Sequence, residues 1–96
     1  MEYVIEFSQD AEDHLDEFSA REQRIIVAAI EKQLLHQPDV ATRNRKLLRE
    51  NPLACWELRV EAIRVFYNVE DDKVLIIALS VKEGNKLFID GKEYEL

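Results

Sequence analysis

The sequence predicts a single α+β domain, residues 1–96, in which two N-terminal helices pack on a mostly antiparallel β-sheet. Three observations lead to this fold class. Apolar residues recur at helical spacing through most of the first half of the chain, and alternating or continuous apolar runs fill the second half. A chain of 96 residues also has room for only one hydrophobic core. The expected order is β-α-α-β-β-β, followed by a short C-terminal strand or hairpin extension.

The first elements are a strand and two helices. Residues 2–7 (EYVIEF) alternate in polarity and predict the strand. Ser8 is expected to cap the first helix, because acidic residues follow it in the first turn, where they favour the helix dipole. Ser19 and Glu22 have the spacing of a capping box and open a longer second helix. Pro38 is expected to end that helix.

The second half of the chain predicts the sheet. Residues 39–54 are polar and basic, which indicates a loop with one helical turn around Arg45 to Leu48. Asp90-Gly91 is a tight-turn signal and predicts a hairpin or a strand-turn-strand tail. Three strands are expected between the loop and the tail, at about 55–60, 63–69 and 73–82.

The central hairpin turns at Glu61-Ala62 in this prediction, which pairs Arg59 with Arg64 across two strands. Side chains of a strand alternate between its two faces, so each face can be written down. The face expected to meet the helices holds Trp56, Leu58, Val60, Ile63, Val65 and Tyr67. The opposite face holds Cys55, Glu57, Arg59, Arg64, Phe66 and Asn68.

Two like charges side by side on a sheet cost stability, and two explanations remain open. In the first, Glu57 and Glu61 neutralise the arginines in an exposed ladder of ion pairs. In the second, the arginines form an anion site, because a guanidinium donates two hydrogen bonds to a phosphate and stays charged. Leu75, Ile77 and Leu79 are expected on the same face as Arg64, so either the C-terminal tail or a partner protein should pack there.

Charge and composition limit the function. A net charge of -7 argues against indiscriminate binding to nucleic acids. The segment 43–67 is the only part of the chain with more basic than acidic side chains, which is compatible with one directed anionic contact. No apolar run reaches the roughly 20 residues that span a bilayer. The N-terminus lacks the pattern of a signal peptide, and a single cysteine favours a cytoplasmic location.

Other candidate groups are weaker. His14 and His36 have no partner at metal-ligand spacing, so structural or surface roles are expected for both. Cys55 is expected to be a buried, inert thiol. The chain contains only two glycines and no glycine-rich phosphate loop. No metal and no cofactor are expected.

Residues 46–88 carry a resemblance to a known family. Trp56-Glu-Leu-Arg-Val is followed by Ile63-Arg-Val-Phe-Tyr, an acidic turn at 70–72 and a buried strand with a lysine after it. The first half adds a strand ending at Phe7-Ser8, an acidic first helix and a longer second helix. In these features the chain resembles the RelE/ParE superfamily of toxins from bacterial type II toxin–antitoxin modules.

The resemblance implies one of two activities. RelE-like toxins cleave mRNA on the ribosome without a metal: a general base deprotonates the ribose 2'-hydroxyl, and cationic groups stabilise the charge on the phosphate. ParE-like toxins share the fold and poison DNA gyrase. Both are held inactive by a cognate antitoxin. The first expectation here is inhibition of translation by mRNA cleavage, in full or attenuated form. The alternative is a non-enzymatic protein, either a gyrase poison or a degenerate toxin that retains antitoxin binding.

The resemblance also implies roles for individual residues. Arg64 matches a family arginine that contacts the scissile phosphate, and Arg59 matches a basic position on the preceding strand. Glu57 is the candidate base, at a strand where the nuclease toxins have lysines. A tyrosine usual near the C-terminus is replaced by Phe88. RNA or phosphate contacts are expected from Arg45, Lys46, Arg49, Lys82 and Lys86. Because these positions match the nuclease pattern only in part, the sequence leaves enzymatic activity open.

Overall fold

The computed structural model describes residues 2–83, 86–90 and 92–94, without the side chains of residues 82–83, 86–88 and 94. Within these residues the helices are α1 (Gln9–Asp16) and α2 (Ala20–Leu34). The strands are β1 (Val4–Phe7), β2 (Arg45–Leu47), β3 (Trp56–Val60), β4 (Ile63–Glu70), β5 (Lys73–Glu83), β6 (Lys86–Ile89) and β7 (Lys92–Tyr94).

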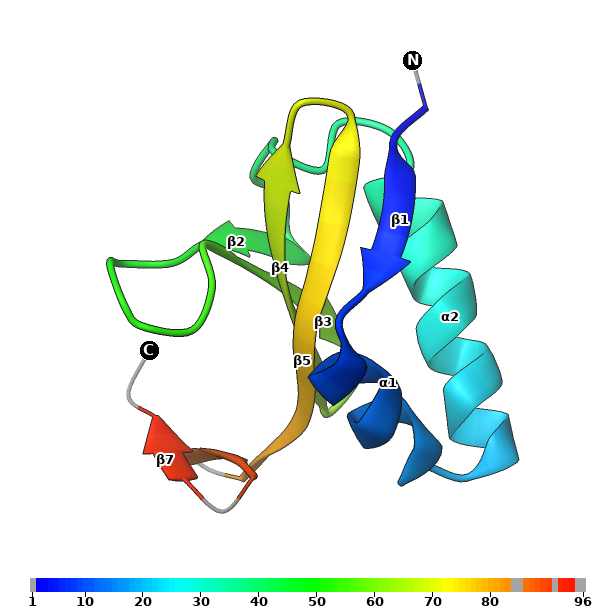
Figure 1. The fold of residues 1–96 in the computed structure, drawn as a ribbon, viewed down its shortest axis with the longest axis vertical. Coiled ribbons are helices and arrows are strands. Elements are labelled where there is room, and N and C mark those ends of the chain that lie inside the picture. Colours follow the sequence, from blue (N-terminus) through cyan, green and yellow to red (C-terminus); the bar gives the residue numbers. More distant parts are fainter. Residues whose placement is uncertain (1, 84–85, 91, 95–96) are drawn as a thin grey trace.

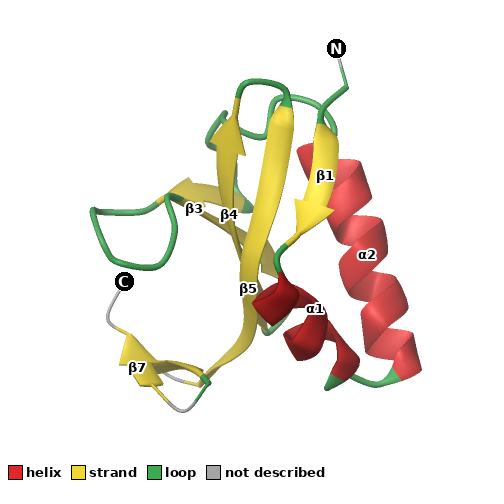
Figure 2. Ribbon diagram, viewed as in Figure 1, coloured by secondary structure: helices red, strands yellow, loops and turns green. Residues whose placement is uncertain are grey.

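The strands form one sheet with helices on one side. The order of its central strands is β2-β3-β4-β5. Strand β1 pairs in parallel with the first part of β5, and the β6–β7 hairpin pairs with the last residues of β5. Figure 1 shows α1 and α2 together on one side of the molecule, and Figure 2 shows the loop before β3 and the β7 end of the chain on the other. The predicted α+β fold is therefore confirmed, and so is the C-terminal hairpin.

The N-terminal ends of both helices form where the sequence places them, whereas α2 ends at Leu34, before the predicted stop at Pro38. The Ser8 hydroxyl accepts a hydrogen bond of 3.1 Å from the backbone N–H of Ala11. Ser19 and Glu22 form the predicted capping box, with two reciprocal bonds of 3.2 Å each. These caps satisfy backbone N–H groups that a helix leaves unpaired, so the boundaries of both helices follow from local chemistry.

The helical turn predicted around Arg45 to Leu48 is wrong, because this segment contains strand β2. The backbone N–H of Arg59 donates to the Asn44 carbonyl and that of Leu48 donates to the Cys55 carbonyl, both at 2.8 Å. These bonds extend the ladder along the edge of β3. A partner strand at the sheet edge therefore decides the conformation of a segment whose local sequence is ambiguous.

The main core lies between the helices and the inner face of the sheet. The central hairpin has the predicted register, with Val60 opposite Ile63 and Arg59 opposite Arg64. All six residues predicted for the inner face belong to this core. The rings of Trp56 and Tyr67 stack there with their centroids 6.1 Å apart. Ile26, Ile30 and Leu34 of α2 close the core from the helix side.

A second, smaller core lies on the outer face of the sheet. It consists of Leu48, Ala54, Phe66, Ala78 and Ile89, so the C-terminal hairpin contributes an apolar side chain to this face. Packing by the tail, one of the two expected possibilities, is thus part of the fold.

The expectation that Leu79 shares a face with Arg64 is wrong. A register shift between Phe66 and Tyr67 interrupts the alternation, so Ser80 lies opposite Arg64 and Leu79 lies opposite Val65 in the main core. A β-bulge adds one residue to a strand and reverses the facing of every residue beyond it.

Candidate functional site

The paired arginines lie on the outer face and differ in exposure. Arg59 is exposed, whereas Arg64 is only 8% exposed. Arg64 Nη1 donates hydrogen bonds to the Glu61 carbonyl at 2.8 Å and to the Ile63 carbonyl at 3.1 Å. Glu61 lies in the turn that joins β3 to β4, and Ile63 is the first residue of β4. The Arg64 guanidinium is therefore held against its own hairpin turn, while the Arg59 side chain reaches solvent.

Glu57 contributes a carboxylate close to this buried cation. Its Oε1 lies 4.0 Å from Arg64 Nε, at the outer limit of an ion pair. Arg64 Nε is buried and has no hydrogen-bond partner among the described residues. Glu57 balances the charge of Arg64, as in the first explanation left open by the sequence, but Arg64 is buried and the Glu61 carboxylate forms no ion pair among the described residues. The anion site stays a prediction. A buried donor without a partner costs about 1–3 kcal/mol and calls for an explanation.

Arg45 does not lie at this site. Its side chain is buried on the inner face of β2. Its Nε donates a 3.0 Å hydrogen bond to the Val40 carbonyl, and its Nη1 donates to the Gln33 carbonyl. These bonds hold the end of α2 and the following loop against the sheet. A role of Arg45 in contacting RNA stays a prediction, and its position favours a structural role.

The other predicted cations are distributed around the outer face. Lys46 is exposed and lies opposite Glu57 in the register of β2 and β3, so it is on the same face as Arg59. Arg49 is exposed in the loop between β2 and β3. The side chains of Lys82 and Lys86 lie outside the described residues. The strands thus place Arg64, Glu57, Arg59 and Lys46 on one face, and Lys46 reaches it through β2, where the sequence predicted a loop. Their roles in binding or catalysis stay predictions.

Cys55 is exposed, so the expectation of a buried thiol is wrong. Its backbone N–H donates a 2.7 Å hydrogen bond to the Asn68 side-chain oxygen across the hairpin. Cys55 directly precedes β3, which begins at Trp56. The sequence around the start of β3 contains no pattern that would have predicted an exposed Cys55.

His14 has a structural role larger than its sequence context indicated. It is buried, its Nδ1 accepts a 3.2 Å hydrogen bond from the Leu79 backbone N–H, and its Nε2 lies 2.8 Å from Asp90 Oδ1. The imidazole therefore connects α1, β5 and the turn of the C-terminal hairpin. Asp90 is 76 residues away in sequence, so no local pattern could have identified this contact.

Tyr67 is a fully buried residue of the main core. Its hydroxyl donates a 2.7 Å hydrogen bond to the Pro38 carbonyl inside the main core. Burial raises the pKa of Tyr67 above its ordinary value, and the nearby Arg45 charge partly opposes this rise. Tyr67 therefore stays neutral and acts as a core residue that fixes the loop after α2.

Two classes of site find no support in the described part of the chain. Among the described residues, no group of three or more histidines, cysteines and carboxylates could hold a metal ion. No described helix is both long and apolar enough to cross a membrane. What the outer face offers is a cationic rim, Arg59 and Lys46, around a Glu57–Arg64 pair. Such a surface can bind an anion or an acidic segment of a protein.

Comparisons with known proteins place the chain in a family. The family model for the ParE toxin of the type II toxin–antitoxin system, parDE, matches residues 5–87. We found no match among curated proteins.

Two solved structures have a similar fold. One is the RelBE2 toxin–antitoxin complex of Mycobacterium tuberculosis, with 21% identity, a TM-score of 0.74, and coverage of 85% of this chain and 93% of that chain. The other is the archaeal RelE–RelB complex of Pyrococcus horikoshii, with 18% identity, a TM-score of 0.67, and coverage of 84% and 96%. Since the family match spans nearly the whole chain, the chain belongs to the ParE toxin family of type II toxin–antitoxin systems.

Proposed function

We propose that this toxin arrests growth by binding a protein target, with DNA gyrase as the target that the ParE branch implies, and not by cleaving mRNA. The observation that carries the proposal is the burial of Arg64, which is 8% exposed and has Nη1 bonded to two carbonyls of its own hairpin. A group that stabilises a phosphate in a transition state must reach that phosphate with free donors. In this conformation Arg64 Nε is covered and cannot do so.

The candidate base supports the same conclusion. Glu57 is half-buried, and its Oε1 faces the Arg64 guanidinium at 4.0 Å. A general base has to lie within hydrogen-bond reach of the proton that it removes. The carboxylate is instead positioned as the counter-ion of a buried cation. Neither histidine offers a substitute base, because His14 is on α1 beneath the sheet and His36 follows α2.

We further propose that a cognate antitoxin keeps the chain inactive. Both similar solved structures are complexes of a toxin with its antitoxin. The exposed outer rim is basic whereas the chain as a whole carries a net charge of -7. An acidic antitoxin segment would therefore find its electrostatic complement at Arg59 and Lys46, and would meet repulsion over most of the remaining surface.

Cleavage of mRNA is the second candidate, and a specific observation favours it. Arg64 Nε is a buried donor with no partner among the described residues, and Arg59 lies beside it on the exposed part of the face. A small outward movement of Arg64 would give a phosphate two neighbouring guanidinium groups. This candidate requires the bonds of Arg64 to Glu61 and Ile63 to break on the ribosome.

One experiment separates the two candidates. The chain is expressed from an inducible promoter in a bacterial host, growth is followed, and mRNA 5' ends are mapped. The purified chain is then added to a gyrase supercoiling assay. The expected result is growth arrest without new mRNA ends, together with inhibition of gyrase.

Three variants accompany the wild type. Arg59→Ala and Glu57→Gln alter the outer site, and Arg43→Ala, an exposed arginine outside the proposed site, is the matched control. The proposal would be overturned in favour of cleavage if the wild type produced new in-frame mRNA 5' ends. These ends should then disappear with Arg59→Ala or Glu57→Gln and persist with Arg43→Ala.

A further inference from the structure

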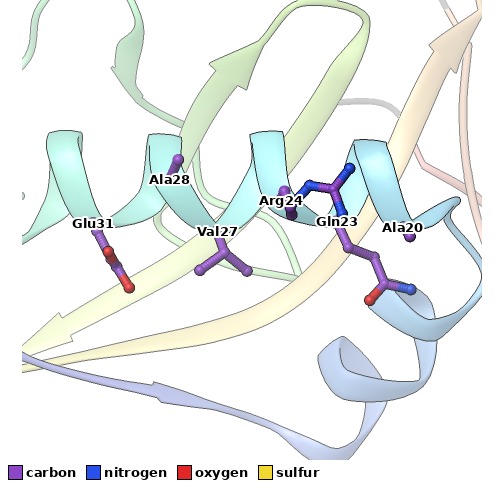
Figure 3. A pocket seen from close by; sticks show the side chains of 6 residues that line it. All are labelled: Ala20, Gln23, Arg24, Val27, Ala28 and Glu31. Atoms are coloured by element: carbon purple, nitrogen blue, oxygen red, sulfur yellow. The ribbon is translucent and has the colours of Figure 1, made fainter.

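A side of α2 next to the buried stripe is hollowed. Figure 3 shows the six residues that line this hollow of about 490 Å³, all of them from α2. They are Ala20, Gln23, Arg24, Val27, Ala28 and Glu31. The stripe of α2 that enters the main core consists of other residues, with Ile26 and Ile30 at its centre. The hollow therefore contributes nothing to the packing of the toxin's own core.

The two charges in the hollow have no ion-pair partner among the described residues. Arg24 and Glu31 are both exposed, and neither takes part in an ion pair within residues 2–83, 86–90 and 92–94. They lie seven residues apart, which is about 10 Å along a helix and too far for a direct contact. Neither has an oppositely charged residue three or four positions away, where helix neighbours interact.

The positions of these charges are symmetric. The midpoint between Arg24 and Glu31 is also the midpoint between Val27 and Ala28. If a second α2 lies antiparallel across this point, Arg24 of each copy meets Glu31 of the other. Val27 and Ala28 then meet at the centre, and the small side chain of Ala28 allows the two helices to approach closely. A self-complementary patch of this kind is the requirement for a two-fold interface.

We propose that this side of α2 binds a second copy of the chain in antiparallel orientation and forms a symmetric dimer. Charge self-complementarity favours this occupant, because any other helix would need its own acid and base at the same spacing. The contact uses only one helix face, so the area that it buries on each partner is well below the roughly 800 Å² of a standard interface. The dimer should therefore be weak, with a dissociation constant on the order of 100 μM. The inference does not depend on the target of the toxin.

Sedimentation equilibrium of the refolded full chain tests the proposal at concentrations from about 10 μM to 1 mM, which bracket the expected dissociation constant. The wild type should rise from its monomer mass of 11.3 kDa towards twice that value. Arg24→Glu and Glu31→Arg should each remain monomeric, because each variant places like charges opposite one another. A 1:1 mixture of the two variants should associate. Arg24→Glu has acidic side chains at positions 24 and 31, Glu31→Arg has basic side chains at both, and these meet in the mixed dimer.

Arg21→Glu is the matched control, since Arg21 is exposed on α2 outside the hollow and its reversal changes the net charge as Arg24→Glu does. Circular dichroism confirms that each variant is folded. A wild type that stays monomeric at 1 mM would overturn the proposal. So would a mixture of the two variants that fails to associate, or an Arg21→Glu variant that loses association as completely as Arg24→Glu.

Discussion

The inner and outer faces of the β3–β4 hairpin are built differently from the same two strands. On the inner face, Leu58 and Val65 are fully buried among apolar side chains beneath the helices. On the outer face, buried Phe66 lies near Arg64, a buried cation with one unpaired donor. The inner face is thus explained by packing alone. The outer face retains a polar group that stability does not account for, which is why we place the functional site there.

The largest expected effect comes from breaking the inner face. Leu58→Ala should lower the free energy of unfolding by about 3 kcal/mol, because Leu58 is fully buried in the main core and its removal leaves a cavity. Leu47→Ala is the matched control on the neighbouring strand, where the side chain is 60% exposed, and it should cost less than about 0.5 kcal/mol. Urea unfolding measures both values, and similar losses would contradict the assignment of the core.

Two buried arginines sharpen the comparison between the faces. Arg45→Met should cost about 2 kcal/mol, because it leaves the Gln33 and Val40 carbonyls without their donor. Arg64→Met should cost less, about 1 kcal/mol, because the lost bonds to the Glu61 and Ile63 carbonyls are partly offset by removal of the buried Nε, which has no partner among the described residues. Urea unfolding is again the measurement. A larger loss for Arg64→Met than for Arg45→Met would contradict this difference between the two arginines.

The contact between α1 and the C-terminal hairpin should have a smaller effect. His14→Phe should cost about 1–2 kcal/mol, because the buried Leu79 N–H loses its acceptor and the contact with Asp90 is lost. Amide exchange of the β6–β7 hairpin should become faster. Asp90→Asn is the control, because its side-chain amide keeps an oxygen near His14 Nε2. It should lower the stability and speed the amide exchange less than His14→Phe does. Equal exchange rates in wild type and His14→Phe would count against this link.

Tyr67→Phe should cost about 1 kcal/mol at neutral pH, because the bond to the Pro38 carbonyl is lost. Its pH dependence is more informative. Because burial raises the pKa of Tyr67, the folded state keeps a proton that the unfolded state releases near pH 10. The wild type should therefore lose stability as the pH rises above about 10, and Tyr67→Phe should lose less over the same range. Urea titrations at pH 8 and 10.5 test this, and parallel losses in both proteins would contradict it.

Most of the fold could be predicted because its signals are local. Ser8, Ser19 and Glu22 cap their helices through neighbours three residues away. The register of the central hairpin follows from one short turn, so the pairing of Arg59 with Arg64 was predictable too. Alternation along a strand also places Glu57, Arg59 and Arg64 on one face. Lys46 joins them only through the pairing of β2 with β3, which the sequence of its segment does not predict.

The sequence by itself determined the helices, the central hairpin and the separation of an apolar face from a mixed one, because each depends on spacing within a few residues. Only the tertiary structure decided that β2 is a strand, that a bulge turns Leu79 inward and that His14 meets Asp90. It also decided that Arg45 is bonded inside the fold, whereas Arg64 retains an unpaired donor at the outer site. These features depend on contacts between segments distant in the chain, and the free energy of such contacts appears only once the core has brought the segments together.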